Sequence, residues 1–254
     1  MKIWYSIFNI NAYTGNEPAF YRSEDFVWAE AIENNWLEIK SELDAHLLSN
    51  PQLIPGIKKQ MVNYHGSWKT MPLMTWGLEF HKNICNFPVT TEVLKQIPGL
   101  VSGSFNLLEK KSEIKHHFGE TNASVRVHLG LCIPDNLPNV GFKVNGISRS
   151  WEEGKVLIFC DGYEHSGWNH SNQDRYILLL DIIRPEFMKK KRLICGNVLA
   201  TLSLQPVMSR STFWFYIIFI PLSILHFFAK ISAVILTPLY NFFSRYKRKK
   251  YFIN

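Results

Sequence analysis

The chain has 254 residues, of which 46% are hydrophobic and 14% aromatic, so we expect one domain with a substantial core and a short appendage. The formal net charge is +7. Much of the positive charge lies in residues 189–192 and 245–250, on either side of an apolar stretch, and no nucleic-acid-binding motif accompanies it. This arrangement favours an anionic membrane surface over nucleic acid as the partner, so no nucleic-acid partner is expected.

The cysteines and the N-terminus both point to a reducing compartment. The N-terminal residues lack the sustained apolar run and the small-residue cleavage site of a signal peptide. We therefore expect the folded domain to face a cytosol, where thiols stay reduced. The four cysteines show no Cys-x-x-Cys spacing, so free thiols are expected at Cys85, Cys132, Cys160 and Cys195.

Two helices are predicted in the first hundred residues. The first begins with Ser23 as a cap and runs to roughly Leu48, and the second runs from Thr90 or Thr91 to just before Pro98. Hydrophobic residues recur along the first helix at helical spacing, which predicts one buried face. The residues of this face are Trp28, Ile32, Trp36, Ile39 and Leu43.

From Val101 to about Ile183 the pattern changes to short β-type runs separated by turn residues, which is typical of a sandwich or a barrel. Residues 125–133 alternate clearly. Valine, leucine and isoleucine occupy one face of this predicted strand, and Arg126 and His128 occupy the other. This predicted strand therefore places an arginine and a histidine together on one face.

Residues 213–243 are overwhelmingly apolar and predict that the tail associates with a membrane. Polar residues and prolines interrupt this stretch, so a kinked span, a re-entrant hairpin and an interfacial helix remain open, as does a buried helix pair of a soluble fold. Basic clusters on both sides favour the hairpin and the interfacial helix, because positive charge tends to stay on the cytoplasmic side. The interruptions are Pro221, His226, Lys230 and Pro238.

Histidines and arginines combine within the β-type region. Histidines on two strands of a barrel can meet at its centre, and an arginine nearby offers two donors to a carboxylate, a combination that suits iron together with a dicarboxylic acid. Non-haem iron oxygenases ordinarily add one carboxylate ligand. Its usual place is two residues after the first histidine, where Gly119 follows His117. The candidate residues are His116, His117, Arg126, His128, His165 and Arg175.

Several short segments carry a more specific pattern. They read HFGETN at 117–122, RVHLGL at 126–131, WEEGK at 151–155 and FCDGYEH at 159–165, followed by Arg175 and Asp181. Together they closely resemble the aspartyl/asparaginyl β-hydroxylase family over roughly residues 105–187. In that family a glycine stands where the carboxylate ligand would be, so Gly119 agrees with the resemblance.

The resemblance implies a fold that is mainly β. We expect a double-stranded β-helix, which is a jelly roll similar to the cupins, with flanking N-terminal helices and an apolar C-terminal helical tail. The expected domains are an N-terminal flank at 1–100, a catalytic core at 101–190 and a basic-flanked, membrane-associating tail at 191–254.

The resemblance also implies a metal site without a carboxylate ligand. His117 and His165 are similar to the family's catalytic Fe(II) ligands, and Arg175 to the residue that pairs with the distal carboxylate of 2-oxoglutarate. Neighbouring residues of a strand point to opposite faces, so only one of His116 and His117 can reach the metal. The family register selects His117.

Three further residues are expected to bind the co-substrate. Arg126 and His128 match residues that contact 2-oxoglutarate or an acidic group of the substrate. Asn106 stands where the family has a serine that helps to bind 2-oxoglutarate, and an asparagine still donates and accepts hydrogen bonds.

The implied activity is that of an Fe(II)- and 2-oxoglutarate-dependent dioxygenase that consumes O2. We expect first the β-hydroxylation of Asp or Asn side chains in a peptide or protein, because the WEEGK segment is closer to the peptide hydroxylases. The alternative is 2-hydroxylation of an acyl chain of a membrane lipid such as lipid A, which the apolar tail favours. A non-catalytic, membrane-attached binding module is the alternative of another class, motivated by Asn106. The expected location is a membrane, with the catalytic domain facing the cytosol.

Overall fold

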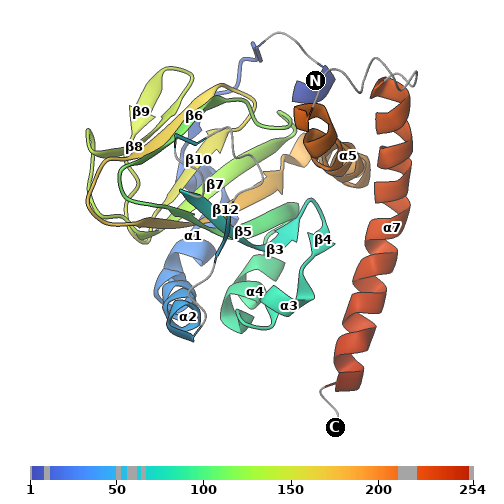
Figure 1. Cartoon of the computed structure of the whole chain (residues 1–254). Helices are drawn as coiled ribbons and strands as arrows, with labels where there is room; N and C mark the ends of the chain where they lie inside the picture. The colour runs from blue at the N-terminus through green and yellow to red at the C-terminus, as the bar shows by residue number, and fades with distance from the viewer. Residues whose placement is uncertain are drawn as a thin grey trace.

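The computed structural model describes residues 2–8, 12–49, 53–55, 62–63, 67–210 and 222–251. Its centre is a large antiparallel sheet, in which the described residues form the order β1-β10-β7-β12-β5-β3-β2, with β4 paired to β3 (Figure 1). The strands are β1 Phe20–Tyr21, β2 Ile54–Pro55, β3 Trp68–Thr75, β4 Leu78–Glu79, β5 Leu100–Leu108, β7 Ser124–Cys132, β10 Val156–Cys160 and β12 Arg175–Ile183.

A smaller sheet faces the large one. Within the described residues its order is β6-β11-β8-β9, with β6 Ser112–His117, β8 Val140–Val144, β9 Ile147–Arg149 and β11 His165–Asn169. Phe142 of the small sheet packs in one buried cluster with Phe159 and Ile177 of the large sheet. The protein is therefore the mainly β, double-stranded β-helix that the resemblance implied.

Helices cover the outer face of the large sheet. These are α1 (Val27–Asn34), α2 (Trp36–Ser49) and α4 (Pro88–Lys95). The short η1 (Ser6–Phe8) and η2 (Ser23–Asp25) precede α1 in the chain, and α3 (His81–Ile84) precedes α4. Ile32, Ile39 and Leu43 are buried in one cluster with the outward-facing residues of β5, β7 and β12. The predicted buried face is confirmed.

The bounds of these helices differ from the prediction in two places. The first helix is interrupted at Asn35, which ends α1, and Ser23 begins the separate turn η2 rather than capping α1. The second helix begins at Pro88, because proline is tolerated in a first turn, where its missing N–H has no helical partner. Glu42 of α2 accepts hydrogen bonds from the backbone N–H groups of Val89 and Thr90 at 2.7 and 2.8 Å, and so caps α4.

The alternation predicted for residues 125–133 is present in β7. Its valine and leucine side chains lie in the cluster beneath the helices, whereas Arg126 and His128 point into the space between the two sheets. Ile133 differs, since it follows the end of the strand and packs against the cluster between the sheets. The strand therefore delivers an arginine and a histidine to the interior.

The C-terminal part of the chain is helical. It contains η4 (Pro185–Lys190), α5 (Lys191–Arg210) and α7 (Leu222–Tyr251), and α7 runs alongside α5 (Figure 1). The segment Ser223–Tyr246 is long and apolar enough to cross a membrane, and only 6% of it is buried. Residues 211–221, where the predicted apolar stretch begins, lie outside the described residues.

The predicted domain boundaries at residues 100 and 190 stay a prediction. The first hundred residues supply β1 to β4 to the large sheet as well as the helices that cover it.

Burial within α2 leads to a stability prediction. Ile39 is 0% exposed and Leu37, two residues away on the same helix, is 60% exposed. We expect Ile39→Ala to lower the free energy of unfolding by about 2–5 kcal/mol, because it leaves a cavity beneath the sheet. Leu37→Ala is the control and should change it by less than about 0.5 kcal/mol in urea titrations. Equal losses would show that α2 does not pack as described.

Candidate active site

His117 and His165 lie directly opposite each other on β6 and β11, with ring centroids 4.1 Å apart. The pairing shifts by one residue at a β-bulge, because Gly167 pairs with Ile114 whereas His165 pairs with His117. Ile114 faces inward, so a regular strand would turn His116 inward as well. The bulge instead turns His117 inward and leaves His116 exposed.

Both rings of this pair are held in the same way. Nδ1 of His117 lies 2.7 Å from the carbonyl of Lys115, and Nδ1 of His165 lies 2.8 Å from the carbonyl of Tyr163. A carbonyl oxygen only accepts, so Nδ1 carries the proton and the lone pair is on Nε2, the form that binds a metal ion. Burial lowers the pKa of His165, and the charges of His117 and Arg126 lower it further.

Gly119 packs against a carboxylate. A Cβ atom added to Gly119 would lie 2.6 Å from the backbone oxygen of Asp161 and even closer to its side chain. The Asp161 side chain is fully buried, with Oδ1 3.5 Å from Nε2 of His165. Asp161 therefore fills the space that a ligand side chain at position 119 would need.

Within the described part of the chain, no His, Cys, Asp and Glu side chains form a group of three that could hold a metal ion. The candidate metal site consequently rests on the histidine pair. Asp161 was visible in the sequence only as part of the family motif, four residues before His165, and its proximity to that pair was not predicted.

Arg126 holds Asp161 in place. Its Nη1 lies 2.6 Å from Asp161, its Nε donates to Asp181 at 2.8 Å, and its Nη2 lies 3.6 Å from Glu120. Burial alone would lower the pKa of Arg126, but these carboxylates outweigh burial and raise it. The guanidinium thus faces carboxylates of its own chain, and the predicted contact with a co-substrate stays a prediction.

Arg175 is the opposite case. Its side chain is 2% exposed, and within the described residues its Nε and Nη1 have no hydrogen-bond partner. Its Cζ lies 4.6 Å from the centroid of the Trp151 ring. Burial lowers the pKa of Arg175 to about 9. A buried cation with unused donors is a binding site for an anion, because a carboxylate would recover the free energy lost on desolvation.

Trp151 also holds His128. Its Nε1 donates to Nδ1 of His128 at 3.2 Å, so the remaining nitrogen of that ring carries the proton. Burial lowers the pKa of His128 well below its usual value, and the charges of Arg175 and Arg126 add to this effect. His128 is therefore a neutral N–H donor in the interior. Trp151, which no sequence pattern singled out beyond the family motif, positions both His128 and Arg175.

Asn106 makes its hydrogen bonds within the chain. Its Oδ1 accepts from Nε1 of Trp68 at 3.1 Å, and its Nδ2 donates to the hydroxyl and the carbonyl of Ser104 at 2.8 and 3.0 Å. Asn106 pairs with Ile177 across the sheet and so lies on the interior face that carries Arg175. Its predicted role in co-substrate binding stays a prediction.

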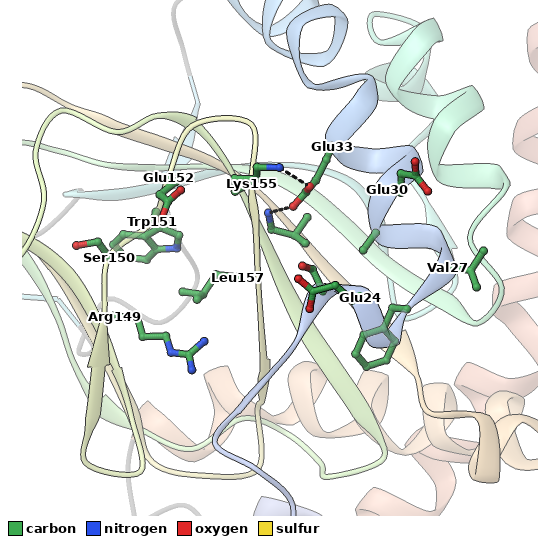
Figure 2. A pocket seen from close by; sticks show the side chains of 14 residues that line it. Glu24, Val27, Glu30, Glu33, Arg149, Ser150, Trp151, Glu152, Lys155 and Leu157 are labelled. Atoms are coloured by element: carbon green, nitrogen blue, oxygen red, sulfur yellow. Dashed lines mark hydrogen bonds and ion pairs between the residues drawn. The ribbon is translucent and has the colours of Figure 1, made fainter.

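A separate cavity of about 830 Å³ opens between α1 and the β9–β10 connection (Figure 2). Figure 2 shows Glu24 and Arg149 lining it from opposite sides, with Glu33 bonded to Lys155. Neither histidine of the pair lines this cavity, and Trp151 is the residue that it shares with the interior. It is therefore distinct from the candidate metal site.

Comparison with known proteins identifies the family of the chain. The family described as Aspartyl/Asparaginyl beta-hydroxylase matches residues 33–185, which is more than half of the chain. The chain belongs to the aspartyl/asparaginyl beta-hydroxylase family.

The names of two relatives of this chain refer to different substrates. The ornithine lipid ester-linked acyl 2-hydroxylase of Rhizobium tropici is 32% identical over 72% of this chain and 66% of its own length. The human aspartyl/asparaginyl beta-hydroxylase is 30% identical over 64% of this chain and 22% of its own length. The chain thus spans just under two thirds of the first relative and about a fifth of the second.

Solved structures with a similar architecture are distant in sequence. A Pseudomonas putida prolyl-4-hydroxylase is 14% identical, with a TM-score of 0.38 over 63% of this chain and 89% of that chain. A viral collagen prolyl hydroxylase from Paramecium bursaria chlorella virus-1, solved with 2-oxoglutarate, is 14% identical, with a TM-score of 0.37 over 56% of this chain and 90% of that chain.

The unused donors of Arg175 lead to a prediction about stability. We expect Arg175→Met to raise the free energy of unfolding of the ligand-free protein by about 1 kcal/mol or more, because it removes a buried charge without an anion. Arg149→Met is the matched control, since Arg149 lies at the same 4.6 Å from the ring of Phe20 but is exposed. In denaturant titrations, Arg149→Met should lower the free energy of unfolding by up to about 1 kcal/mol. A large loss for Arg175→Met would show that the arginine is already paired in the ligand-free protein.

Proposed function

We propose that this hydroxylase-family protein is an Fe(II)- and 2-oxoglutarate-dependent dioxygenase. The observation that carries the proposal is the combination of two imidazoles with matched Nε2 lone pairs and one buried arginine whose donors await an anion. Neutral imidazole suits Fe(II), and a guanidinium suits a carboxylate of a dicarboxylic acid. The residues present therefore fit both groups.

Each residue then has a distinct part. His117 and His165 would hold the iron, and Arg175 would bind the distal carboxylate of 2-oxoglutarate. His128 would donate a hydrogen bond from its protonated nitrogen to the same co-substrate. Bound iron, together with 2-oxoglutarate and O2, supplies the oxidising step that replaces a C–H hydrogen by a hydroxyl group. Arg126 positions Asp161 beside the histidine pair, where its carboxylate can accept a hydrogen bond from a water molecule.

Aromatic side chains supply the dry surroundings. The rings of Phe142 and Phe159 have centroids 5.8 and 5.6 Å from that of His165, and both are buried between the sheets. Exclusion of water strengthens the charge pairing of Arg175 with a bound carboxylate and protects the oxidising step from side reactions.

For the substrate, we propose an acyl chain of a membrane lipid, which would be hydroxylated at carbon 2. This reverses the order expected from the sequence. The match to this chain covers 66% of the rhizobial lipid hydroxylase, whereas it covers 22% of the human aspartyl/asparaginyl beta-hydroxylase. The apolar helix α7, which has no acidic residue, supports a substrate within a membrane.

The segment that follows His117 is connected to the apolar helix α7, which agrees with a lipid substrate. Thr121, four residues after His117, forms a β-bridge with Tyr5. The hydroxyl of Tyr5 accepts a hydrogen bond from Asn197 of α5 at 3.2 Å, and α5 packs on α7. The loop that follows the first proposed iron ligand is therefore connected through α5 to the apolar helix.

Hydroxylation of Asp or Asn side chains is the second candidate. The family description and the human relative favour it. A non-catalytic binding module is less well supported, because the histidine pair and Arg175 lie on the same interior.

We propose further that the protein is attached to a membrane with its catalytic domain in the cytosol. The four cysteines are free thiols, which suits a reducing compartment. No nucleic-acid partner is proposed.

The two adjacent histidines of β6 test the metal site. We expect His117→Ala and His165→Ala to abolish anaerobic Fe(II) binding and 2-oxoglutarate turnover, because each removes one of two proposed ligands. His116→Ala is the control and should keep both, since His116 is exposed and faces away from His165. Retention of 2-oxoglutarate turnover by His165→Ala would refute the assignment of His165 as an iron ligand. Absence of 2-oxoglutarate turnover by the iron-loaded wild type with peptide and lipid extracts would refute the enzyme proposal.

Mass spectrometry of cells with and without the gene tests the substrate. We expect one lipid class to lose a mass of one oxygen when the gene is deleted, and to regain it with the wild-type gene but not with His165→Ala. If lipids are unchanged and a peptide loses one oxygen at Asp or Asn, the second candidate is correct.

A further inference from the structure

Helix α7 is attached to the folded domain near both of its ends. Near its start, His226 is 2% exposed and lies 3.2 Å from the carbonyl of Asn197 and the hydroxyl of Thr201, both on α5. Near its end, Asn241 accepts from the backbone N–H of Glu79 at 3.1 Å and donates to the carbonyl of Gly77 at 2.8 Å.

The attachment continues between these ends and beyond them. Arg192 of α5 donates to the carbonyl of Val234 at 3.0 Å, and Gly196 lets the two helices approach closely, because a Cβ there would collide with Val234. Arg245 forms an ion pair with Glu79 in the β3–β4 hairpin. The contacting positions on α7 are His226, Val234, Asn241 and Arg245, at successive spacings of 8, 7 and 4 residues. These spacings are close to whole numbers of helical turns, so the four positions form one face of the helix.

The remaining face of α7 is apolar and exposed. Twelve large hydrophobic side chains between Ile224 and Tyr246 are each at least 36% exposed, including Phe228 at 61%, Ile235 at 51% and Phe243 at 58%. Contiguous exposure of this kind is rare on soluble monomers and marks a surface that binds a membrane or another protein.

This attachment is incompatible with a helix that crosses a bilayer. His226 and Arg245 are 19 residues apart, or about 29 Å along an α-helix, which is close to the thickness of a hydrocarbon core. If α7 spanned that core, the polar contacts at one of its ends would have to lie across the membrane from the rest of the domain. From this we infer that α7 lies in the plane of the membrane surface, with its exposed apolar face among the lipid chains and its other face on the domain.

Charge identifies the kind of membrane surface. Residues 187–254 contain 11 of the 28 basic residues of the chain and none of its 21 acidic residues. Lys189 is exposed near the end of η4 and is one of the residues that line the groove between α5 and α7, as are Thr237 and Pro238 of α7. Basic side chains beside an exposed apolar face fit the headgroups of anionic lipids.

The inference rests on the proposed membrane attachment, and depth measurements separate the two. The full chain, with its native cysteines replaced by alanine, would carry one environment-sensitive fluorophore on a cysteine at Ile224, Ile235 or Phe243. Ile147, which is 53% exposed on β9, is the matched control. Vesicles would contain phosphatidylcholine with or without phosphatidylglycerol, and quenchers on the lipid chain near the headgroup or near the terminal methyl.

We expect the three labels on α7 to be quenched equally and mainly by the shallow quencher, and the label at Ile147 to be unaffected. Deep quenching at Ile235 with shallow quenching at Ile224 and Phe243 would overturn the in-plane inference but leave membrane attachment standing. If the wild-type chain does not bind vesicles, both the in-plane inference and the proposed membrane attachment are overturned. The same holds if two copies associate through α7 and the chain does not bind the vesicles.

A charge variant of the otherwise unchanged chain gives a second measurement. We expect Lys189→Gln to weaken binding to vesicles with phosphatidylglycerol about fivefold and binding to phosphatidylcholine alone hardly at all. Lys110→Gln is the control, because Lys110 is exposed in the β5–β6 connection, and it should bind as the wild type does. Unchanged affinity of Lys189→Gln for the anionic vesicles would overturn the assignment of an anionic surface.

Discussion

The β-bulge between β6 and β11 is the constraint on which the candidate site depends. One extra residue on β6 places His117, rather than His116, opposite His165 and brings the two rings 4.1 Å apart. Because the strands are hydrogen-bonded to each other, the two side chains share one rigid framework. The site therefore does not need a mobile loop to assemble its metal-binding groups, and the loop after His117 is available to contact the N-terminal segment and α5.

Trp151 connects the other half of the interior to this framework. It contacts Arg175 with its ring and His128 with its indole N–H, so that two groups proposed to bind one co-substrate depend on a single side chain. Arg126 makes a comparable connection by joining the buried carboxylates of Asp161 and Asp181. The interior thus contains two arginines of opposite character. Arg126 is already paired with carboxylates, and Arg175 has donors without a partner among the described residues.

Local patterns in the sequence were sufficient for some of these features and insufficient for others. The alternation of β7 and the buried face of Ile32, Ile39 and Leu43 follow from the periods of a strand and a helix, so both could be predicted. The choice of His117 over His116 depends on a bulge, which shifts strand parity and leaves no local signal. Only the family motif selected the histidine that lies opposite His165.

Contacts between distant segments were also beyond prediction from local patterns. One partner of Asn106 is Trp68, 38 residues earlier, and one partner of Arg126 is Asp181, 55 residues later. Neither separation follows from a helical or strand period, since it depends on the order of strands in the sheet. The break of the first helix at Asn35 was missed because the hydrophobic spacing continues across it.

The distribution of charge has a consequence for how the protein meets its surroundings. All 21 acidic residues and 17 of the 28 basic residues precede residue 187, so the body of the molecule is net negative and its C-terminal helices are strongly positive. Such a molecule has a large electric dipole moment. Approaching an anionic surface, it would rotate before contact, because the body is repelled while the tail is attracted. The encounter itself would therefore select the orientation in which the apolar helix arrives first.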